Sequence, residues 1–530
     1  MKNKFIILGL LASLMTTFSG CSDQLEDKFL SPEKSTDASI PGFFTSMLNN
    51  DRIRPSYWNT RTFLLTHTAV YTQTAFFMNA NTAYQQSDSY TDQYWTDFYV
   101  SGSNGGGVMS TYTAMQVAYE NLSEEEKAGF EIFMNAGKVV LINEASKMVD
   151  LWGDIPFSEA ASLIENSSIQ NGKFDDQQEL YTTFISDLKT ISDYFASTET
   201  TASFSKYDIL LSGDVNMWRR YTNSLRLRLL MRISNVDEST AQTAIQEMLN
   251  NSATYPLLDG GDNGNYNPAS EDVLLEPLTT YIDNLNSALT ELPSHYAPDY
   301  LLNTAMLPVD DPRIPVMFDK FGKTVSNNFV PNEEFKAMPI TFTSAQQEQQ
   351  FANYSIVDST TFMQNPSLPG IVMTASEVNF LKAEAYERWG GGDAGQAYET
   401  AIQQSVSFYY YLNNINETGL PVEEKPDANV ITEFLATSGV AYEGSTQEKL
   451  QKIWIQKWLH LGFLQSVEAW AEYRRTGFPE LTFPEANLSG YRTPPSRLVY
   501  PSSEKNYNSQ NYQAVQAQDV RDGKIFWDVD

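Results

Sequence analysis

The sequence predicts a mostly α-helical protein in which paired helices form a scaffold, long ordered loops join them and β structure is sparse. Three observations favour this class. Apolar residues recur at helical spacing in several segments, a glycine-rich turn separates two such segments, and few stretches alternate strictly between apolar and polar residues. Hydrophobic residues make up 42% and charged residues 19% of the 530 positions, so the composition is globular and the chain can bury a sizeable core.

The amino terminus has the parts of a secretory signal peptide. Lys2 and Lys4 precede the apolar run Phe5–Met15, and the small residues Ser19 and Gly20 stand just before Cys21. The apolar run has 11 residues. A membrane-spanning helix needs roughly 20, so a permanent transmembrane anchor is not expected here. We therefore expect residues 1–20 to be a cleaved signal peptide.

Cys21 is the only cysteine of the sequence, so no disulfide forms within the chain. The tetrapeptide Phe18-Ser-Gly-Cys21 resembles the processing box of bacterial lipoproteins, although Phe18 stands where that box usually carries leucine. The resemblance implies that Cys21 is lipidated, and several acyl chains give a stable membrane anchor. Residues 21–40 would form an acidic tether, and the acids just after the cysteine resemble the signal for the outer face of the outer membrane. The alternatives are an ordinary thiol and a plain solvated linker.

The charge balance excludes some classes of partner. The chain carries 35 basic and 66 acidic side chains, a formal net charge of −31. A protein that binds nucleic acid needs a clustered basic surface to neutralise phosphates. We therefore expect no nucleic-acid partner, and adsorption to an anionic membrane surface is disfavoured for the same reason.

Five segments place apolar residues at the spacing of an amphipathic helix: residues 179–195, 214–234, 376–389, 397–411 and 449–474. The turn Gly390–Gly395 joins the third and fourth segments, which predicts a helical hairpin. Alanines on the facing sides let two helices approach closely. Their spacing resembles that of tetratricopeptide units, most clearly over residues 374–411.

Four long segments between these helices lack a helical period. They are rich in Gly, Pro, Asn, Asp and Tyr, and we expect them to be ordered loops that serve a function: residues 79–107, 257–277, 293–315 and 420–427.

Several blocks of sequence resemble the SusD/RagB family. They are Trp152-Gly-Asp-Ile-Pro156, Gly213–Trp218 with Asn223–Arg228, Asp311-Pro-Arg-Ile-Pro315, Ala375–Ala385, Glu468–Pro479, and Pro495–Pro501 followed by Glu504 and Asn508. The resemblance implies one SusD-like helical domain over residues 41–530, anchored by lipid to the outer membrane and facing the extracellular side. It also implies a SusC-like, TonB-dependent transporter as partner, to which the protein delivers an oligosaccharide or an oligopeptide.

The aromatic and basic residues of these blocks are expected to hold loops to the scaffold, because a guanidinium satisfies several carbonyls or carboxylates: Trp470, Arg474, Arg475, Arg497 and Tyr500. A second group of arginines could suggest a polyanion site, but internal ion pairs are favoured in so acidic a chain: Arg219, Arg220, Arg226, Arg228 and Arg232.

The candidate ligand-binding residues lie in the irregular segments, where aromatic rings stand among polar side chains. Sugar rings stack on exposed aromatic planes and hydrogen-bond to neighbouring polar groups, and peptides use similar surfaces. The first set is Asn81, Tyr84, Tyr90, Tyr94 and Trp95, and the second is Tyr266, Tyr296 and Tyr300. Tyr84 and Tyr90 are the better surface candidates. Trp95 could instead begin a helix and belong to the core.

Catalytic, metal and cofactor patterns are weak. The string Gly390-x-Gly392-x-x-Gly395 follows a helix, whereas a dinucleotide fingerprint follows a strand. The three histidines are far apart, and Asp259–Asn265 lacks the spacing of a calcium loop. We expect a non-catalytic binding protein without metal or cofactor. The alternatives are a surface glycoside hydrolase and a helical-repeat scaffold that binds only protein.

Overall fold

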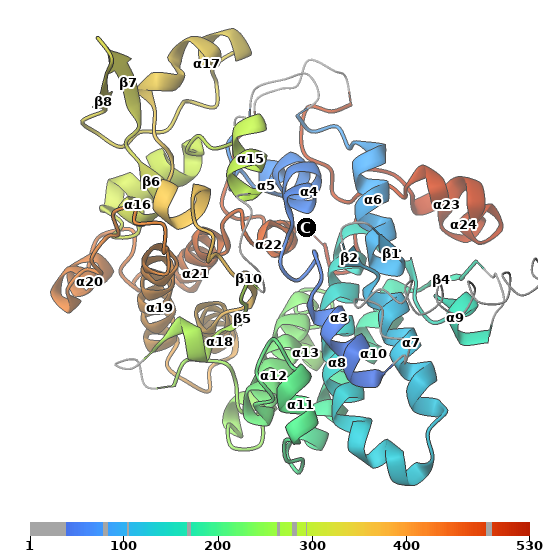
Figure 1. The fold of residues 1–530 in the computed structure, drawn as a ribbon. Coiled ribbons are helices and arrows are strands. Elements are labelled where there is room, and N and C mark those ends of the chain that lie inside the picture. Colours follow the sequence, from blue (N-terminus) through green and yellow to red (C-terminus); the bar gives the residue numbers. More distant parts are fainter. Residues whose placement is uncertain are drawn as a thin grey trace, which may run out of the picture.

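The computed structural model describes residues 39–77, 83–102, 105–166, 171–261, 266–277, 284–292, 294–483 and 490–529. Helices dominate these residues, as the sequence predicts, and the strands form small local pairs (Figure 1). The predicted fold class is therefore confirmed.

The α-helices, in chain order, are α3 (Ile40–Leu48), α4 (Tyr57–Asn59), α5 (Ala69–Tyr71), α6 (Asp88–Tyr99), α7 (Val108–Glu120), α8 (Glu124–Trp152), α9 (Ser162–Asn166), α10 (Gln177–Phe195), α11 (Ala202–Tyr207), α12 (Val215–Arg232), α13 (Glu238–Asn250), α14 (Pro268–Glu271), α15 (Asn284–Glu291), α16 (Ile314–Met317), α17 (Ser344–Gln350), α18 (Ala375–Trp389), α19 (Ala394–Asn414), α20 (Ala428–Leu435), α21 (Thr446–Leu461), α22 (Ser466–Thr476), α23 (Ser502–Tyr507) and α24 (Ser509–Val515). The π-helices are η1 (Thr60–Thr68), η3 (Tyr300–Met306) and η6 (Ser359–Met363), and the 3-10 helices are η4 (Leu307–Val309), η5 (Phe351–Asn353) and η7 (Gln516–Gln518).

The strands form five antiparallel pairs within the described ranges. They are β1 (Ser101–Gly102) with β2 (Gly105–Gly106), β3 (Ile155–Pro156) with β4 (Phe174–Asp175), β5 (Val273–Leu275) with β10 (Gly370–Met373), β6 (Phe318–Asp319) with β9 (Ile356–Val357), and β7 (Gly322–Val325) with β8 (Asn328–Pro331). The β7–β8 hairpin projects from the helical body beside α17 (Figure 1).

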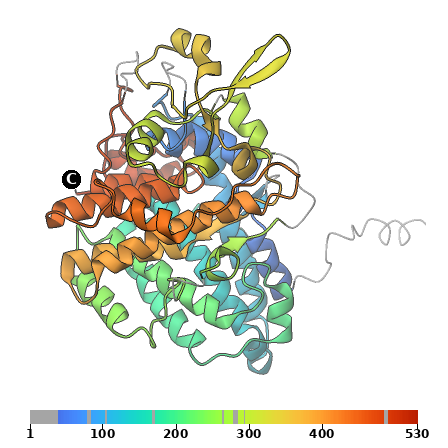
Figure 2. The ribbon, with the colours of Figure 1, turned by 90° about the vertical axis from the view of Figure 1, so that its left-hand side faces the viewer.

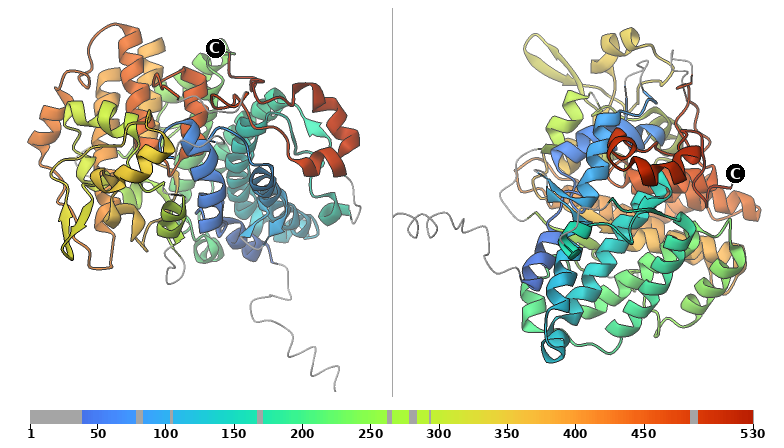
Figure 3. Two further views of the ribbon diagram at one scale, coloured as in Figure 1. Left: turned by 90° about the horizontal axis from the view of Figure 1, so that it is seen from above. Right: turned by 90° about the vertical axis from the view of Figure 1, so that its right-hand side faces the viewer.

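The long helices gather in two groups. Helices α7, α8, α10, α12 and α13 fill the lower part of Figure 1, and α18, α19, α21 and α22 lie across them in the perpendicular view of Figure 2. Seen from above, the blue segment that includes α6 lies between the orange helices and the red pair α23 and α24 (Figure 3).

Local sequence signals fix where these helices begin and end. Helix α8 begins with a capping box, in which the Ser123 hydroxyl accepts the Glu126 N–H and the Glu126 carboxylate accepts the Ser123 N–H. Gly153 ends it at φ +83°, a conformation that side chains with a Cβ rarely adopt. In the predicted hairpin, Thr374 caps α18 and Asp393 caps α19, with the glycine-rich turn between them.

Several expectations about elements were wrong. The expected loop 257–277 contains α14 and β5, and the expected loop 293–315 contains η3 and η4. Residues 449–474 form two helices, because α21 ends at Gly462, which has φ +52°, and α22 begins at Ser466. Residues 79–107 were expected to be a loop but include α6. Its buried side chains recur three or four positions apart and pack inward, although the mean polarity of the segment hides this pattern: Thr91, Tyr94, Trp95 and Phe98.

A buried ionic network joins α8, α12, α18 and α22. Arg228 contacts Glu377 at 2.6 Å and Arg232 contacts Glu468 at 2.7 Å. Arg475 contacts Glu384 at 2.7 Å, and both side chains are almost fully buried. The expectation of internal ion pairs is confirmed for Arg228 and Arg232. The other three arginines of α12 lie nearer its surface or outside the network: Arg219 donates to the carbonyl of Thr254, Arg220 lies 4.0 Å from Glu271, and Arg226 lies over the ring of Tyr255.

The carboxyl-terminal blocks hold loops to the helices, as expected. Arg474 lies over the ring of Trp470 and donates to the carbonyls of Ser496 and Asp150. The guanidinium of Arg497 reaches the carbonyl of Gln518, and the hydroxyl of Tyr500 donates to the carbonyl of Asp154. These residues are therefore structural and lie apart from the surface described next.

Candidate ligand-binding site

Asn81, and Cys21 with the rest of residues 1–38, lie outside the described residues. Tyr84 is described and is only 1% exposed, in edge-to-face contact with Phe77 and Phe483. The expectation that Tyr84 lies on the surface is wrong, because the rings of Phe77 and Phe483 pack against it.

Tyr94 and Trp95 point into the core from α6. The ring of Tyr94 stacks on Phe63 at a centroid distance of 3.7 Å. The guanidinium of Arg52 also lies over the Tyr94 ring, 3.9 Å from its centroid. Trp95 donates its indole N–H to Glu504 at 3.0 Å. Both side chains are buried. This placement agrees with the alternative that Trp95 packs in the core, and ligand contact by either residue stays a prediction.

The second predicted set is spread over the loops of residues 266–300. Tyr266 donates its hydroxyl to Asp272 at 2.7 Å. Tyr296 is buried and stacks on Phe351 at 4.4 Å. Tyr300 is half-buried and packs edge-to-face on Trp458. A role in ligand binding stays a prediction for this set as well.

Three residues of the first set line cavities: Tyr84 and Tyr90 line two neighbouring clefts, and Tyr94 lines the small cavity described below. The side chain of Tyr90 is half-buried, and its cleft has a volume of about 630 Å³. The rest of the cleft wall mixes apolar and polar groups: Leu65, Thr66, His67, Val70, Phe77, Ala83, Gln85, Gln86, Ser87, Asp88, Leu292 and Ser294. A neighbouring cleft of about 400 Å³ shares Gln86 and Asp88 with it. Together they offer room for an oligomer of several units.

Tyr90 also belongs to a group of polar and aromatic side chains that the sequence did not predict. We call this group the aromatic surface: Tyr57, Trp58, Arg61, Tyr90, Gln93 and Glu291, all of them at least partly exposed. They come from α4, η1, α6 and α15, which lie together in the upper middle of Figure 1. Helix α15 contacts both α4 and η1, and α6 contacts η1.

Hydrogen bonds hold the aromatic surface in place. The Tyr57 hydroxyl donates to Glu291 at 2.5 Å, and the Nε of Arg61 donates to the same carboxylate oxygen at 2.7 Å. Another guanidinium nitrogen of Arg61 donates to the hydroxyl of Tyr90 at 3.4 Å. The Trp58 indole N–H donates to the side chain of Gln93. The donated hydrogen bonds of Tyr57 and Arg61 lower the pKa of Glu291, so its carboxylate is ionised at neutral pH.

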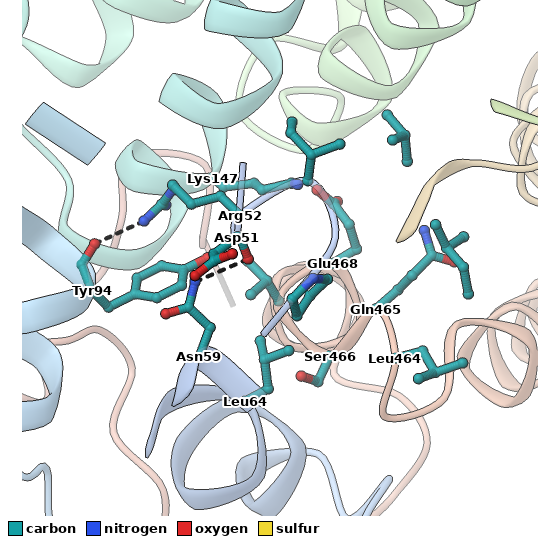
Figure 4. Close-up of a pocket in the computed structure, with 15 residues that line it drawn as sticks. Asp51, Arg52, Asn59, Leu64, Tyr94, Lys147, Leu464, Gln465, Ser466 and Glu468 are labelled. Carbon is teal, nitrogen blue, oxygen red and sulfur yellow. Dashed lines mark hydrogen bonds between the residues drawn. The ribbon is translucent and has the colours of Figure 1, made fainter. Parts of the chain in front are cut away.

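A smaller cavity is lined by residues of α4, η1, α6, α8 and α22 (Figure 4). Its volume is about 40 Å³, and its charged lining comprises Asp51, Arg52, Lys147 and Glu468. Arg52 donates to the carbonyl of Tyr94 across it. Burial raises the pKa of Asp51 to about 6, partly offset by the hydroxyl of Ser56. A cavity of this size holds a few water molecules and is too small for a sugar ring.

The described residues contain no group of three or more His, Cys, Asp or Glu side chains arranged to hold a metal ion. His67 and His460 are buried in the core instead. Burial lowers the pKa of His67 to about 4, and His460 bridges Thr374 and Ser405. No helix among the described ranges combines the length and apolarity that crossing a membrane requires.

A family model of SusD-like proteins, described as starch-binding and associating with the outer membrane, matches residues 34–501. The chain belongs to this family. The predicted resemblance is thereby confirmed. Members of this SusD-like family are binding proteins without catalytic activity, which agrees with the prediction that the chain is not an enzyme.

Solved structures share the fold over nearly the whole chain. A chitin-binding protein is 21% identical with a TM-score of 0.73, covering 93% of this chain and 100% of that one. A chitin-binding SusD homologue from Flavobacterium johnsoniae is 22% identical with a TM-score of 0.69, covering 93% and 99%. A SusD homologue from Bacteroides uniformis is 21% identical with a TM-score of 0.68, covering 93% and 100%. No protein with a curated description matches the chain.

Proposed function

We propose that this SusD-like protein is a lipoprotein of the cell surface that binds nutrient oligosaccharides on the aromatic surface and delivers them to a SusC-like, TonB-dependent transporter. The single observation that carries the proposal is the gathering of three half-buried rings, Tyr57, Trp58 and Tyr90, around hydrogen-bonding groups, with Tyr90 also lining the large cleft.

The chemistry of the aromatic surface suits a sugar. Aromatic rings pack against the apolar C–H faces of sugar rings, and the carboxylate of Glu291 and the amide of Gln93 can accept or donate hydrogen bonds to hydroxyl groups. The rings of Tyr57 and Trp58 lie 6.2 Å apart and are inclined by 37°, so they can support adjacent parts of one chain. An oligopeptide is the weaker candidate ligand, since the family is one of glycan-binding proteins.

Two further points support the proposal. The chitin-binding proteins with this fold suggest an oligosaccharide built from neutral units as the first ligand to try. The lipid anchor rests on Cys21 and its processing box. Placement at the outer membrane agrees with the association that describes the family.

Binding can be tested by isothermal titration calorimetry against chito-oligosaccharides, malto-oligosaccharides and other uncharged glycans. Replacing Tyr57 and Trp58 by alanine should weaken binding about tenfold or more, because each stacked ring contributes roughly 0.5–1.5 kcal/mol. The matched control is Tyr507→Ala, since Tyr507 is 80% exposed on α23 and lies away from the aromatic surface. Equal affinity of the double variant and the control would remove the aromatic surface as the binding site.

Two cellular measurements test the rest of the proposal. Cys21→Ser should release the protein from the outer-membrane fraction, because the thiol that carries the acyl chains is gone. Purification of the wild-type protein from mild detergent should bring a large TonB-dependent barrel with it. Cleavage of the bound glycans during these assays would instead support the alternative of a glycoside hydrolase.

A further inference from the structure

The aromatic surface contains an ion pair that is more exposed than those of the core. The side chain of Arg61 is 23% exposed and that of Glu291 is 47% exposed, and 2.7 Å separates Arg61 Nε from Glu291 Oε2. Both therefore remain within reach of a ligand that lies on the rings of Tyr57 and Tyr90.

The arginine alone would attract acidic ligands. A guanidinium is planar, permanently charged and matches the geometry of carboxylate and sulfate groups. Beside exposed aromatic rings, an unpaired Arg61 would favour sugars that carry such groups. Glu291 occupies that position instead and takes the Nε–H of Arg61.

The other charges near the aromatic surface also disfavour an acidic ligand. Among the ionisable side chains of the aromatic surface and its 630 Å³ cleft, Arg61 is positive, Glu291 and Asp88 are negative, and His67 is neutral because burial lowers its pKa to about 4. One positive and two negative charges leave a local sum of −1. An acidic ligand is therefore repelled, and the formal charge of −31 on the whole chain adds to the repulsion at low salt.

We propose that Glu291 determines which glycans this surface accepts: by pairing with Arg61 it admits uncharged oligosaccharides and rejects those that carry carboxylate or sulfate groups. The inference rests on the proposed function, because it needs glycans to bind at the aromatic surface. Glu291 acts as a specificity-determining residue, and it also positions the Tyr57 hydroxyl and the Arg61 guanidinium.

Glu291→Gln tests this role while keeping the shape of the side chain and an oxygen that accepts the hydrogen bond from Tyr57. Glu124→Gln is the matched control. Glu124 also pairs with a basic residue, Lys127, at 2.7 Å, but at the exposed start of α8, so the control changes the net charge equally. Wild type and both variants are titrated with hexamers of N-acetylglucosamine and glucose as uncharged probes, and with hexagalacturonate and a sulfated hexasaccharide as acidic probes.

The readout is the ratio of affinities for acidic and uncharged probes. Glu291→Gln should raise this ratio about fivefold, the effect of one unit charge about 4 Å away in a solvent-exposed site, and 0.5 M salt should reduce the gain. Glu124→Gln should leave the ratio unchanged. An unchanged ratio in Glu291→Gln, or a wild type that prefers acidic probes, would overturn the inference but leave glycan binding intact. A folded wild type that binds none of the probes would overturn both proposals.

Discussion

Replacing Arg475 by methionine tests how strongly the ionic network stabilises the helical scaffold. Arg475 makes four hydrogen bonds to two carboxylates, at 2.7 Å, 2.7 Å, 2.7 Å and 3.2 Å, and it is 1% exposed. Methionine keeps much of the side-chain volume and removes the charge. After this substitution Glu472 still has Lys457 as a basic partner, at 3.0 Å. Within the described network, Glu384 keeps only Arg388 as a basic partner, at 3.5 Å. We expect the free energy of unfolding to fall by about 3–5 kcal/mol, the usual cost of leaving a buried charge without its partner.

The loss of stability in Arg475→Met should depend on pH in a defined direction. Burial alone would raise the pKa of Glu384, but Arg475 outweighs it and holds the pKa below the ordinary value of 4.5. In the wild type this carboxylate therefore stabilises the fold above pH 4.5, and the contribution is lost as the pH falls through the folded-state pKa. Without Arg475, burial raises the folded-state pKa of Glu384 above 4.5. Protonation of Glu384 then removes its unpaired buried charge as the pH falls. The difference between variant and wild type should be largest at pH 7 and shrink toward pH 5.

Urea unfolding followed by circular dichroism at pH 7 and pH 5 measures both effects. Lys127→Met is the control, because its partner Glu124 is 89% exposed and such surface pairs contribute about 0–1 kcal/mol. Adding Glu384→Gln to Arg475→Met should restore part of the lost stability, since the stranded charge disappears. A loss below 1 kcal/mol, a loss independent of pH, or a double variant less stable than Arg475→Met would refute the reasoning.

Three further substitutions test buried contacts and backbone conformation elsewhere in the fold. Trp95→Phe should lower the free energy of unfolding by about 1–3 kcal/mol, because Glu504 loses the indole N–H and burial already raises its pKa; thermal unfolding measures it, and an unchanged midpoint would contradict it. Gly153→Ala should cost about 1–3 kcal/mol in urea unfolding, because φ +83° is strained for alanine and the new Cβ would lie 3.3 Å from the Arg497 guanidinium. Asp272→Asn should gain stability relative to wild type as the pH rises from 4 to 8, because burial raises the pKa of Asp272 to about 7 and its ionisation destabilises the fold. A difference that stays constant over this pH range would argue against that assignment.

The helical scaffold was largely predictable because its signals are local. Apolar periodicity and the glycine-rich turn placed the hairpin of α18 and α19 within a few residues of its observed bounds. The interruption at Gly462 was missed because apolar residues continue across it, and only the backbone conformation shows the break.

The aromatic surface was less predictable because it is assembled from distant segments. Tyr57 and Glu291 are separated by 234 positions yet share a hydrogen bond. Aromatic content alone could not separate Tyr90, which is half-buried, from Tyr84, which is 1% exposed, since both lie among polar residues in the sequence. The charge pairing of Arg61 could not be inferred either, because one arginine has many acids within the chain as candidate partners.

The ionic network has a consequence for motion. Its guanidinium groups match their carboxylates only at fixed positions, and a shift of one helix by a single turn, about 5.4 Å, would separate several pairs at once. Helices α8, α12, α18 and α22 should therefore move together as one rigid frame. If a ligand binds at the aromatic surface as proposed, the segments free to adjust to it lie outside this frame, in α4, η1 and α15.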